Sequence, residues 1–108
     1  MRLLLDECID EGLRYHFTGQ ECQTCRYPGL TGLANGALLA AADQAGFEVL
    51  ITVDQNMPFQ QDLRGRFISL LVIRTRTTNL DDLLVLMPDM LHALENPRPG
   101  EVIRIGSL

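Results

Sequence analysis

Three acidic residues follow two apolar runs that lie far apart in the chain. Asp6 and Glu7 come directly after Leu3-Leu4-Leu5, and Asp54 closes the run that begins at Val49. Carboxylate oxygens are the ligands that Mg²⁺ and Mn²⁺ prefer, and a cation held by them can orient water and offset charge on a phosphodiester. If the two runs lie side by side, the acids meet and form a divalent-cation site.

Both apolar runs have the features of buried strands. They are short and rich in leucine and β-branched residues, which favours a strand over residues 2–5 and another over 48–53. In open parallel sheets, ligands bind outside the carboxyl ends of the strands, near the point where the strand order reverses. Consecutive residues at a strand end point in different directions, so Asp6 is the preferred partner of Asp54 and Glu7 is expected to assist. The alternative is that these acids are solvated strand ends or that Asp6 caps a helix.

The remaining pattern alternates between helix and strand. We expect a helix over 8–17, a strand over 21–25, a loop over 27–33, a helix capped by Asn35 and closed by Gly46, a short helix or loop over 57–66, a strand over 67–73, a helix kinked or broken at Pro88, and an edge strand over 101–105. Such alternation predicts right-handed crossovers. The expected fold is one three-layer α/β/α domain spanning residues 1–108, with a mostly parallel sheet of four to five strands in the order 2-1-3-4.

Composition limits the class of protein. The chain has 108 residues, of which 46% are hydrophobic, and no apolar run approaches the ~20 residues needed to cross a bilayer. The start of the chain does not resemble a signal peptide, so we expect a cytoplasmic protein without membrane contact. Three cysteines do not suggest a disulfide framework, and the lone pair Cys22 and Cys25 lacks the further ligands of a zinc site.

The distribution of charge in the sequence allows a local binding site for an anion but not a broad basic surface. The net charge is −5, which argues against a broad nucleic-acid-binding surface. All nine basic residues are arginine, and Arg74 and Arg76 follow the strand over 67–73, at the sheet edge expected to carry the acids. Arginine favours bidentate phosphate contacts, so both could bind substrate. The alternative is ion pairing with Asp81 and Asp82.

Three motifs together resemble a known family. Leu3-Leu4-Leu5-Asp6-Glu7, the segment Leu33-Ala34-Asn35-Gly36-Ala37-Leu38-Leu39, and Ile51-Thr52-Val53-Asp54-Gln55-Asn56-Met57 are similar to the short bacterial PIN-like proteins. This group is related to the PIN-domain nucleases, which include VapC-type toxins of toxin–antitoxin pairs. The resemblance covers most of the chain, and its order and spacing are more specific than any one motif.

The resemblance implies a PIN-like fold and a Mg²⁺- or Mn²⁺-dependent endoribonuclease. It implies that Asp6 and Asp54 bind the metal, with Glu7 as a further catalytic residue, and it places the strand-end threonine of the family on Thr52. RNA is then the substrate, an antitoxin protein is a partner, and a homodimer is expected. Many relatives carry an acid at the start of the middle helix, where this chain has Asn35, which can ligate through its carbonyl but brings no charge.

Substrate contacts would come from polar residues around the acids. The expected substrate-binding residues are Asn35, Thr52, Asn56, Arg74 and Arg76. Asn56, with its neighbour Gln55, could instead cap the following segment. Asp81 and Asp82 match the late acids of full PIN domains by position only and are better explained as residues of a helix start.

Two other functions fit part of the pattern. A PIN-like protein that binds a partner without catalysis is favoured by Asn35 and by the net negative charge. A receiver-like phosphoacceptor domain would use the acid pair after the first strand, Asp54 after the third, and Thr75 after the fourth. The absence of lysine from the sequence weighs against this last function, because receiver domains need a phosphate-binding lysine.

Overall fold

The computed structural model describes residues 1–106, which form an α/β domain around a five-stranded sheet. All strand pairs are parallel and the order is β2-β1-β3-β4-β5. The strands are β1 (Arg2–Leu5), β2 (Glu21–Thr24), β3 (Val49–Thr52), β4 (Ser69–Arg74) and β5 (Val102–Gly106). The predicted order of the first four strands is confirmed, and β5 extends the sheet beyond β4.

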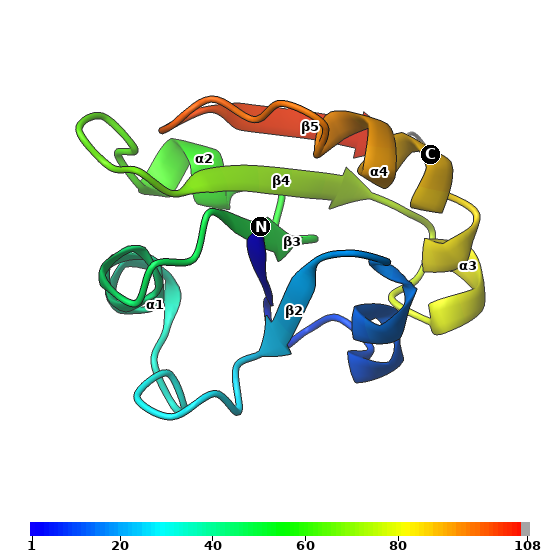
Figure 1. Cartoon of the computed structure of the whole chain (residues 1–108), viewed down its shortest axis with the longest axis horizontal. Helices are drawn as coiled ribbons and strands as arrows, with labels where there is room; N and C mark the ends of the chain where they lie inside the picture. The colour runs from blue at the N-terminus through cyan, green and yellow to red at the C-terminus, as the bar shows by residue number, and fades with distance from the viewer. Residues whose placement is uncertain (107–108) are drawn as a thin grey trace.

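Helical segments pack on both faces of this sheet. They are the 3₁₀ helix η1 (Glu11–His16) and the α-helices α1 (Asn35–Gln44), α2 (Met57–Gln60), α3 (Leu80–Leu84) and α4 (Met87–Ala93). One core cluster joins the sheet to η1, α3 and α4, and a second joins it to α1 and α2. Figure 1 shows α3 on the opposite side of the molecule from α1.

The central strands are apolar on both sides because both sides are covered. Leu5 and Ile51 are paired in register and contribute to the core cluster under η1, α3 and α4. Leu4 and Leu50, one residue earlier, contribute to the cluster under α1 and α2. A strand buried on both faces carries a continuous rather than an alternating apolar pattern. The same alternation places the next pair in register, Asp6 and Thr52, on the α1 and α2 side.

The helix predicted over residues 8–17 is wrong over residues 8–10, and the segment that follows is a 3₁₀ helix. The chain instead turns directly after β1, where the Ile9 N–H donates to the Asp6 carbonyl at 3.0 Å. The carboxylate of Asp10 then accepts the Gly12 N–H at 2.8 Å and starts a 3₁₀ helix at Glu11. A short aspartate side chain that bonds its own local backbone competes with the helical pattern, which explains the late start.

The ends of α1 differ in how well the sequence predicts them. Ala34 is the N-cap, and Asn35 is the first helical residue, with φ of 24°. The prediction that Asn35 caps this helix is therefore wrong. At the other end Gly46 has φ of +86°, its N–H donates to the Asp43 carbonyl, and the next N–H, of Phe47, donates to the Ala42 carbonyl. These two bonds form a Schellman motif, which confirms the predicted glycine stop.

The prediction of a kink or break at Pro88 is confirmed as a break. Pro88 lies in the first turn of α4, and α3 ends at Leu84. A proline is tolerated at a helix start because the N–H it lacks would have no partner there. Asp81 and Asp82 lie in the first turn of α3, as predicted for residues of a helix start.

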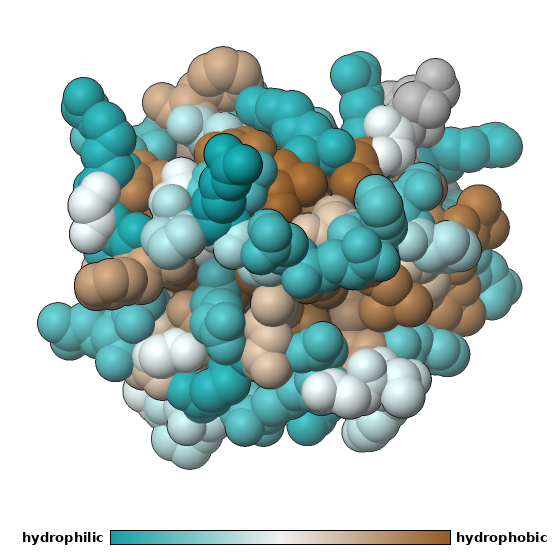
Figure 2. Space-filling model, turned by 45° about the horizontal axis from the view of Figure 1, so that its top comes forward, coloured by the Kyte–Doolittle hydropathy of each residue, from teal (hydrophilic) through white to brown (hydrophobic). Residues whose placement is uncertain are grey.

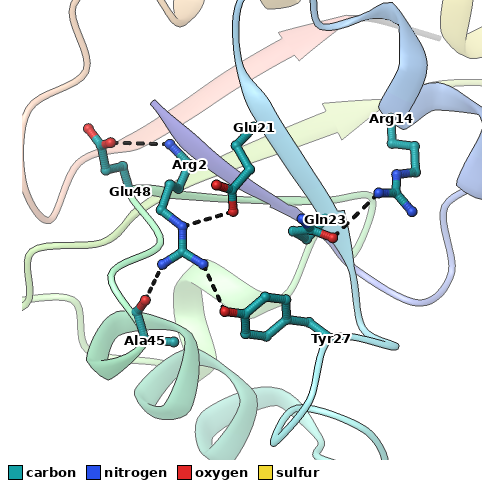
Figure 3. Close-up of polar contacts among 7 residues, drawn as sticks. All are labelled: Arg2, Arg14, Glu21, Gln23, Tyr27, Ala45 and Glu48. Atoms are coloured by element: carbon teal, nitrogen blue, oxygen red, sulfur yellow. Dashed lines mark hydrogen bonds and ion pairs between the residues drawn. The ribbon is translucent and has the colours of Figure 1, made fainter.

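Arg2 connects several elements at the edge of the sheet where the amino ends of the strands lie. Its guanidinium pairs with Glu21 of β2 at 3.0 Å, contacts the Tyr27 hydroxyl, and donates to the carbonyl of Ala45 at the end of α1 (Figure 3). It also lies over the Phe47 ring, 4.3 Å from the ring centre. A cation at a helix C-terminus stabilises the exposed carbonyls there. One side chain therefore holds β1, β2 and α1 together.

The surface combines charged and apolar side chains. On the face shown in Figure 2, polar side chains cover much of the surface and apolar side chains emerge between them. The exposed large apolar side chains are Tyr15, Phe59, Phe67, Val85, Leu91 and Val102. Among the described residues, no helix has the length and apolar character needed to cross a membrane.

Candidate functional site at the carboxyl edge of the sheet

The buried hydroxyl of Thr52 links the two predicted metal-binding acids. Its Oγ1 donates to Asp6 Oδ2 at 2.7 Å and accepts the backbone N–H of Asp54 at 3.1 Å. Thr52 is fully buried, whereas both aspartates are half-buried. The backbone N–H of Asp6 also donates to the Ile51 carbonyl at 2.9 Å, which extends the pairing of β1 with β3 by one residue. The sequence prediction that the ends of these strands are neighbours is confirmed.

This link lies where the strand order reverses. From β1 the chain moves outward to β2 and then returns past β1 to β3, so β1 and β3 flank the switch point. Ligands of open parallel sheets bind in the crevice at such a point. The fold therefore presents Asp6 and Asp54 at the position where a ligand site is expected.

Local hydrogen bonds orient both aspartates. Asp6 Oδ1 accepts the Glu7 N–H at 2.9 Å, and Asp54 Oδ1 accepts the Asn56 N–H at 2.9 Å. The latter bond is an Asx turn that leads into α2, whose N-cap is Asn56. Each carboxylate keeps lone pairs beyond these bonds, because an ionised carboxylate can accept about four. Both therefore retain the capacity to bind a further group.

Glu7 and Asp6 both border a pocket on the β2 side of the acids. The pocket has a volume of about 270 Å³ and lies between the end of β1, the start of η1 and the loop after β2. The lining residues are Asp6, Glu7, Ile9, Glu11, Thr24, Cys25, Arg26, Thr31 and Gly32. Glu7 is exposed, and its carboxylate takes part in no ion pair among the described residues. Asp6 therefore borders both the Thr52 link and this pocket, whereas Glu7 borders the pocket.

The start of α1 packs against the segment after α2. A Cβ added to Gly36 would lie 2.8 Å from Oε1 of Gln61, so the glycine leaves room for the Gln61 amide. In a right-handed crossover from β2 to β3 the helix begins at the carboxyl edge, which brings the exposed Asn35 to the same edge as the acids. No hydrogen bond joins the Asn35 side chain to Asp6 or Asp54 among the described contacts.

Arg74 and Arg76 lie at the carboxyl end of β4, the strand next to β3. Both are exposed, and neither forms an ion pair within the described part of the chain. They line two shallow pockets of about 240 and 260 Å³, the larger of which includes the Thr77 and Thr78 side chains. The alternative that they pair with Asp81 or Asp82 is wrong, since Asp82 accepts the Thr77 hydroxyl at 2.6 Å instead.

Gln55 lies between the aspartates and the arginines and connects the strands that carry Asp54 and Arg74. Its side-chain amide donates to the Ile73 carbonyl at 2.8 Å and to the Val53 carbonyl at 3.2 Å. These bonds join the ends of β3 and β4, so Gln55 fixes the spacing of Asp54 and Arg74 across the edge.

The acids and thiols that the structure describes at this edge do not gather into a three-ligand metal group. Among residues 1–106, His, Cys, Asp and Glu side chains form no group of three or more that could hold one metal ion. A cation here would therefore take oxygens from Asp6 and Asp54, with water and substrate phosphate as its other ligands. This oxygen-only donor set with two carboxylates fits Mg²⁺, which is commonly bound in that way, and does not suit a soft metal.

Two thiols near Asp6 are held in their neutral form. Burial, followed by the charges of Asp6 and Glu7, raises the pKa of Cys25 to about 11. Burial and the Asp6 charge also raise the pKa of Cys8, whose Sγ lies 3.8 Å from Asp6 Oδ2. Both thiols therefore add no negative charge to the acidic edge at neutral pH.

Sequence reasoning missed the residues that build the pocket beside Glu7. Thr24, Cys25 and Thr31 come from the end of β2 and the loop after it, and no motif marks them. Their common feature is position alone, because β2 pairs with β1 and its carboxyl end lies beside Asp6 and Glu7. The only available signal was the predicted strand order.

Comparisons of the chain with protein-family models, with curated proteins and with solved structures gave no significant match. The resemblance of the three sequence motifs to the PIN-like proteins therefore stays a prediction.

Proposed function

We propose that this protein is a PIN-like, metal-dependent endoribonuclease, of the kind that acts as the toxin of a toxin–antitoxin pair. The observation that carries the proposal is the Thr52 hydroxyl, which binds the Asp6 carboxylate and the Asp54 backbone at the switch point of the sheet. A buried hydroxyl that orients a ligand carboxylate is typical of metal sites, where such outer contacts hold the ligands in place.

Asp6 and Asp54 would hold Mg²⁺ or Mn²⁺, with Thr52 as the residue that positions Asp6. When bound, the cation would lower the pKa of a coordinated water and offset charge on the phosphodiester. The exposed amides of Asn35 and Asn56 lie on helix starts at the same edge and would contact substrate. Glu7, on the β2 side, would contact substrate rather than the cation.

Arg74 and Arg76 would receive the phosphates next to the scissile bond. Both guanidinium groups are exposed and take part in no ion pair among the described residues, which leaves them available to a ligand anion. They follow β4, and Gln55 ties the end of that strand to the end of β3. A polyanion that approaches the acids would therefore meet local positive charge, although the chain has a net charge of −5.

The strand order alone does not distinguish this function from that of a receiver domain, because the order 2-1-3-4-5 also serves phosphoacceptor proteins. The residues favour the nuclease. The sequence has no lysine to bind a phosphoryl group, and Arg74 and Arg76 offer two exposed phosphate contacts instead of one. The non-catalytic binding protein is favoured by the small number of acids, since Thr52 contacts one carboxylate, that of Asp6, and only the backbone N–H of Asp54.

One assay separates these functions. Purified protein is incubated with a labelled single-stranded RNA and Mn²⁺ or Mg²⁺, with a chelator control. The proposal predicts metal-dependent cleavage that is lost in Asp54→Asn, while Asp89→Asn, which changes an exposed acid of α4, keeps it. RNA binding without cleavage by the folded protein would support the binding protein, and labelling of Asp54 by acetyl phosphate would support the receiver.

A further inference from the structure

The pocket beside Glu7 differs in charge from the arginine region across the site. It is lined by Glu7 and by two further carboxylates, those of Asp6 and Glu11. Its one cation, Arg26, is already paired with Glu11 at 2.8 Å. Such a pocket repels phosphate and favours a neutral group that can donate hydrogen bonds.

Its size and polar groups suit a single small ring system. The volume of about 270 Å³ is near the lower end of ligand-binding cavities. Thr24, only 8% exposed, accepts the Arg26 N–H at 3.3 Å, and its hydroxyl proton has no acceptor among the described residues. Thr31 reaches the pocket from the following loop, with its hydroxyl against the Cys25 carbonyl at 3.3 Å. Hydroxyl groups of this kind can reorient toward a ligand.

Glu7 is the group best placed to select the ring. Its carboxylate can only accept hydrogen bonds, it is exposed at the pocket, and it forms no ion pair among residues 1–106. The other two carboxylates of the pocket already have partners, because Asp6 accepts the Thr52 hydroxyl and the Glu7 N–H, and Glu11 pairs with Arg26. The Cys25 thiol beside Glu7 is neutral, which leaves Glu7 as the hydrogen-bond acceptor on this side of the pocket. Arg26 is held by Glu11 and is 83% exposed, so its planar guanidinium can stack on a base at the mouth of the pocket.

We propose that this pocket binds one base of the RNA, and that Glu7 selects guanine there. The proposal rests on the ribonuclease function argued above and names a specificity residue for it. Guanine is the only standard base whose Watson–Crick edge presents two adjacent donor groups, N1–H and N2–H₂, which match the two oxygens of one carboxylate. Adenine and cytosine present one amino group beside an acceptor nitrogen, and uracil presents one N–H between two carbonyls.

The positions of the pocket and the arginines suggest how an RNA strand could cross the carboxyl edge of the sheet. The base pocket lies on the β2 side of the acids, and Arg74 and Arg76 lie on the β4 side. A nucleotide bound at Glu7 would place its neighbouring phosphate near Asp6 and Asp54, and the next phosphates toward the arginines. The substrate is then single-stranded, because a base read on its Watson–Crick edge cannot be paired.

Nucleoside binding tests the pocket without cleavage. Guanosine, inosine and uridine are titrated into the metal-free protein, and amide chemical shifts are followed by NMR. Guanosine is expected to perturb Glu7, Cys25 and Thr31, and inosine, which lacks the N2 amine, is expected to bind roughly fivefold more weakly or worse. Equal shifts for guanosine and uridine, or no shift at these residues at millimolar concentration, would overturn the proposal.

Two variants separate the selection of a base from the fold and from cleavage. Glu7→Gln cannot accept from both donors and is expected to remove the preference for guanosine, whereas Glu95→Gln, at an exposed acid beyond α4, is expected to keep it. Guanosine binding that survives in Glu7→Gln with its preference intact would contradict the role of Glu7. These titrations need no catalysis, so the two proposals can fail separately. Guanosine binding without RNA cleavage would contradict the nuclease alone, and RNA cleavage without a guanosine preference would contradict the base pocket alone.

Discussion

The Thr52 hydroxyl lies 2.7 Å from Asp6 Oδ2 and donates to it from a position fully excluded from solvent. The two residues are 46 positions apart in the chain and belong to adjacent parallel strands. The same oxygen accepts the Asp54 N–H, so one buried atom sets the relative position of both predicted metal ligands. The candidate site therefore depends on this contact.

Removal of the Thr52 hydroxyl should affect both metal binding and stability. Thr52→Val keeps the shape of the side chain but leaves the Asp54 N–H and Asp6 without their shared partner. We expect a loss of about 1–3 kcal/mol in the free energy of unfolding and a fall of about 10–100-fold in Mn²⁺ affinity or cleavage rate. Urea unfolding and Mn²⁺ titration measure the two effects, and Thr52→Ser, which restores the hydroxyl, should recover most of the Mn²⁺ affinity. Equal Mn²⁺ affinity in the wild type and Thr52→Val would refute the positioning role.

Arg74 and Arg76 should contribute to RNA binding through charge alone. Each phosphate contact that is lost lowers the dependence of log affinity on log salt by ~1. Arg74→Gln and Arg76→Gln should therefore each reduce that slope by about one in fluorescence anisotropy titrations. Arg64→Gln is the matched control, because Arg64 already pairs with Asp62 at 2.9 Å in a loop before β4. A slope unchanged in both variants would place the RNA elsewhere.

Arg2 should matter for stability and not for chemistry. It lies at the amino end of β1, and its contacts with Glu21, Tyr27 and Ala45 need the planar fork of a guanidinium (Figure 3). Arg2→Lys should therefore lower the melting temperature measurably more than Arg64→Lys, at a residue that is 92% exposed. Calorimetry gives both values, and a melting temperature equal to that of the wild type would show that the network of contacts contributes little.

Thiol reactivity provides a pH test of the site environment. Burial and the nearby acids raise the pKa of Cys25 to about 11, and burial raises that of Cys22 to about 12, so neither becomes a thiolate near neutral pH. A raised thiol pKa contributes stability below the pKa of the unfolded chain, and this contribution is lost as the pH rises through the folded value. Alkylation of the native protein, followed by mass spectrometry, should accelerate up to about pH 11 at Cys25, whereas the unfolded chain should level off near about pH 8.5. A native profile for Cys25 that levels off with the unfolded one would contradict its placement beside Asp6 and Glu7.

The sequence was most informative where strands are buried on both faces. The apolar runs before Asp6 and Asp54 fit central strands that are covered on both faces, and the usual rules of crossover connections favour placing the two strands side by side. The helix predicted after β1 was less reliable, because the Asp10 side chain bonds its own backbone and replaces the regular helical pattern with a 3₁₀ turn. Local side-chain bonds of that kind are weakly encoded in hydrophobic periodicity.

The candidate site was only partly predictable for a related reason. The apolar runs in the sequence locate the ends of two strands, and Asp6, Thr52 and Asp54 lie at those ends. The pocket beside Glu7 depends instead on Thr24 and Thr31, which reach it through the pairing of β2 with β1 and the course of the following loop. Loop geometry is set by glycine conformations such as those of Gly29 and Gly32, and no periodic pattern records where such a loop leads.

The most direct test of the account is a crystal structure of the protein soaked in Mn²⁺ and recorded at a wavelength where manganese scatters anomalously. We expect an anomalous peak within coordination distance, about 2.0–2.3 Å, of a carboxylate oxygen of both Asp6 and Asp54. The peak should disappear in Asp54→Asn crystals, in which Thr52 still contacts Asp6. Carboxylates that remain without a cation at millimolar Mn²⁺, or a peak bound elsewhere, would contradict it.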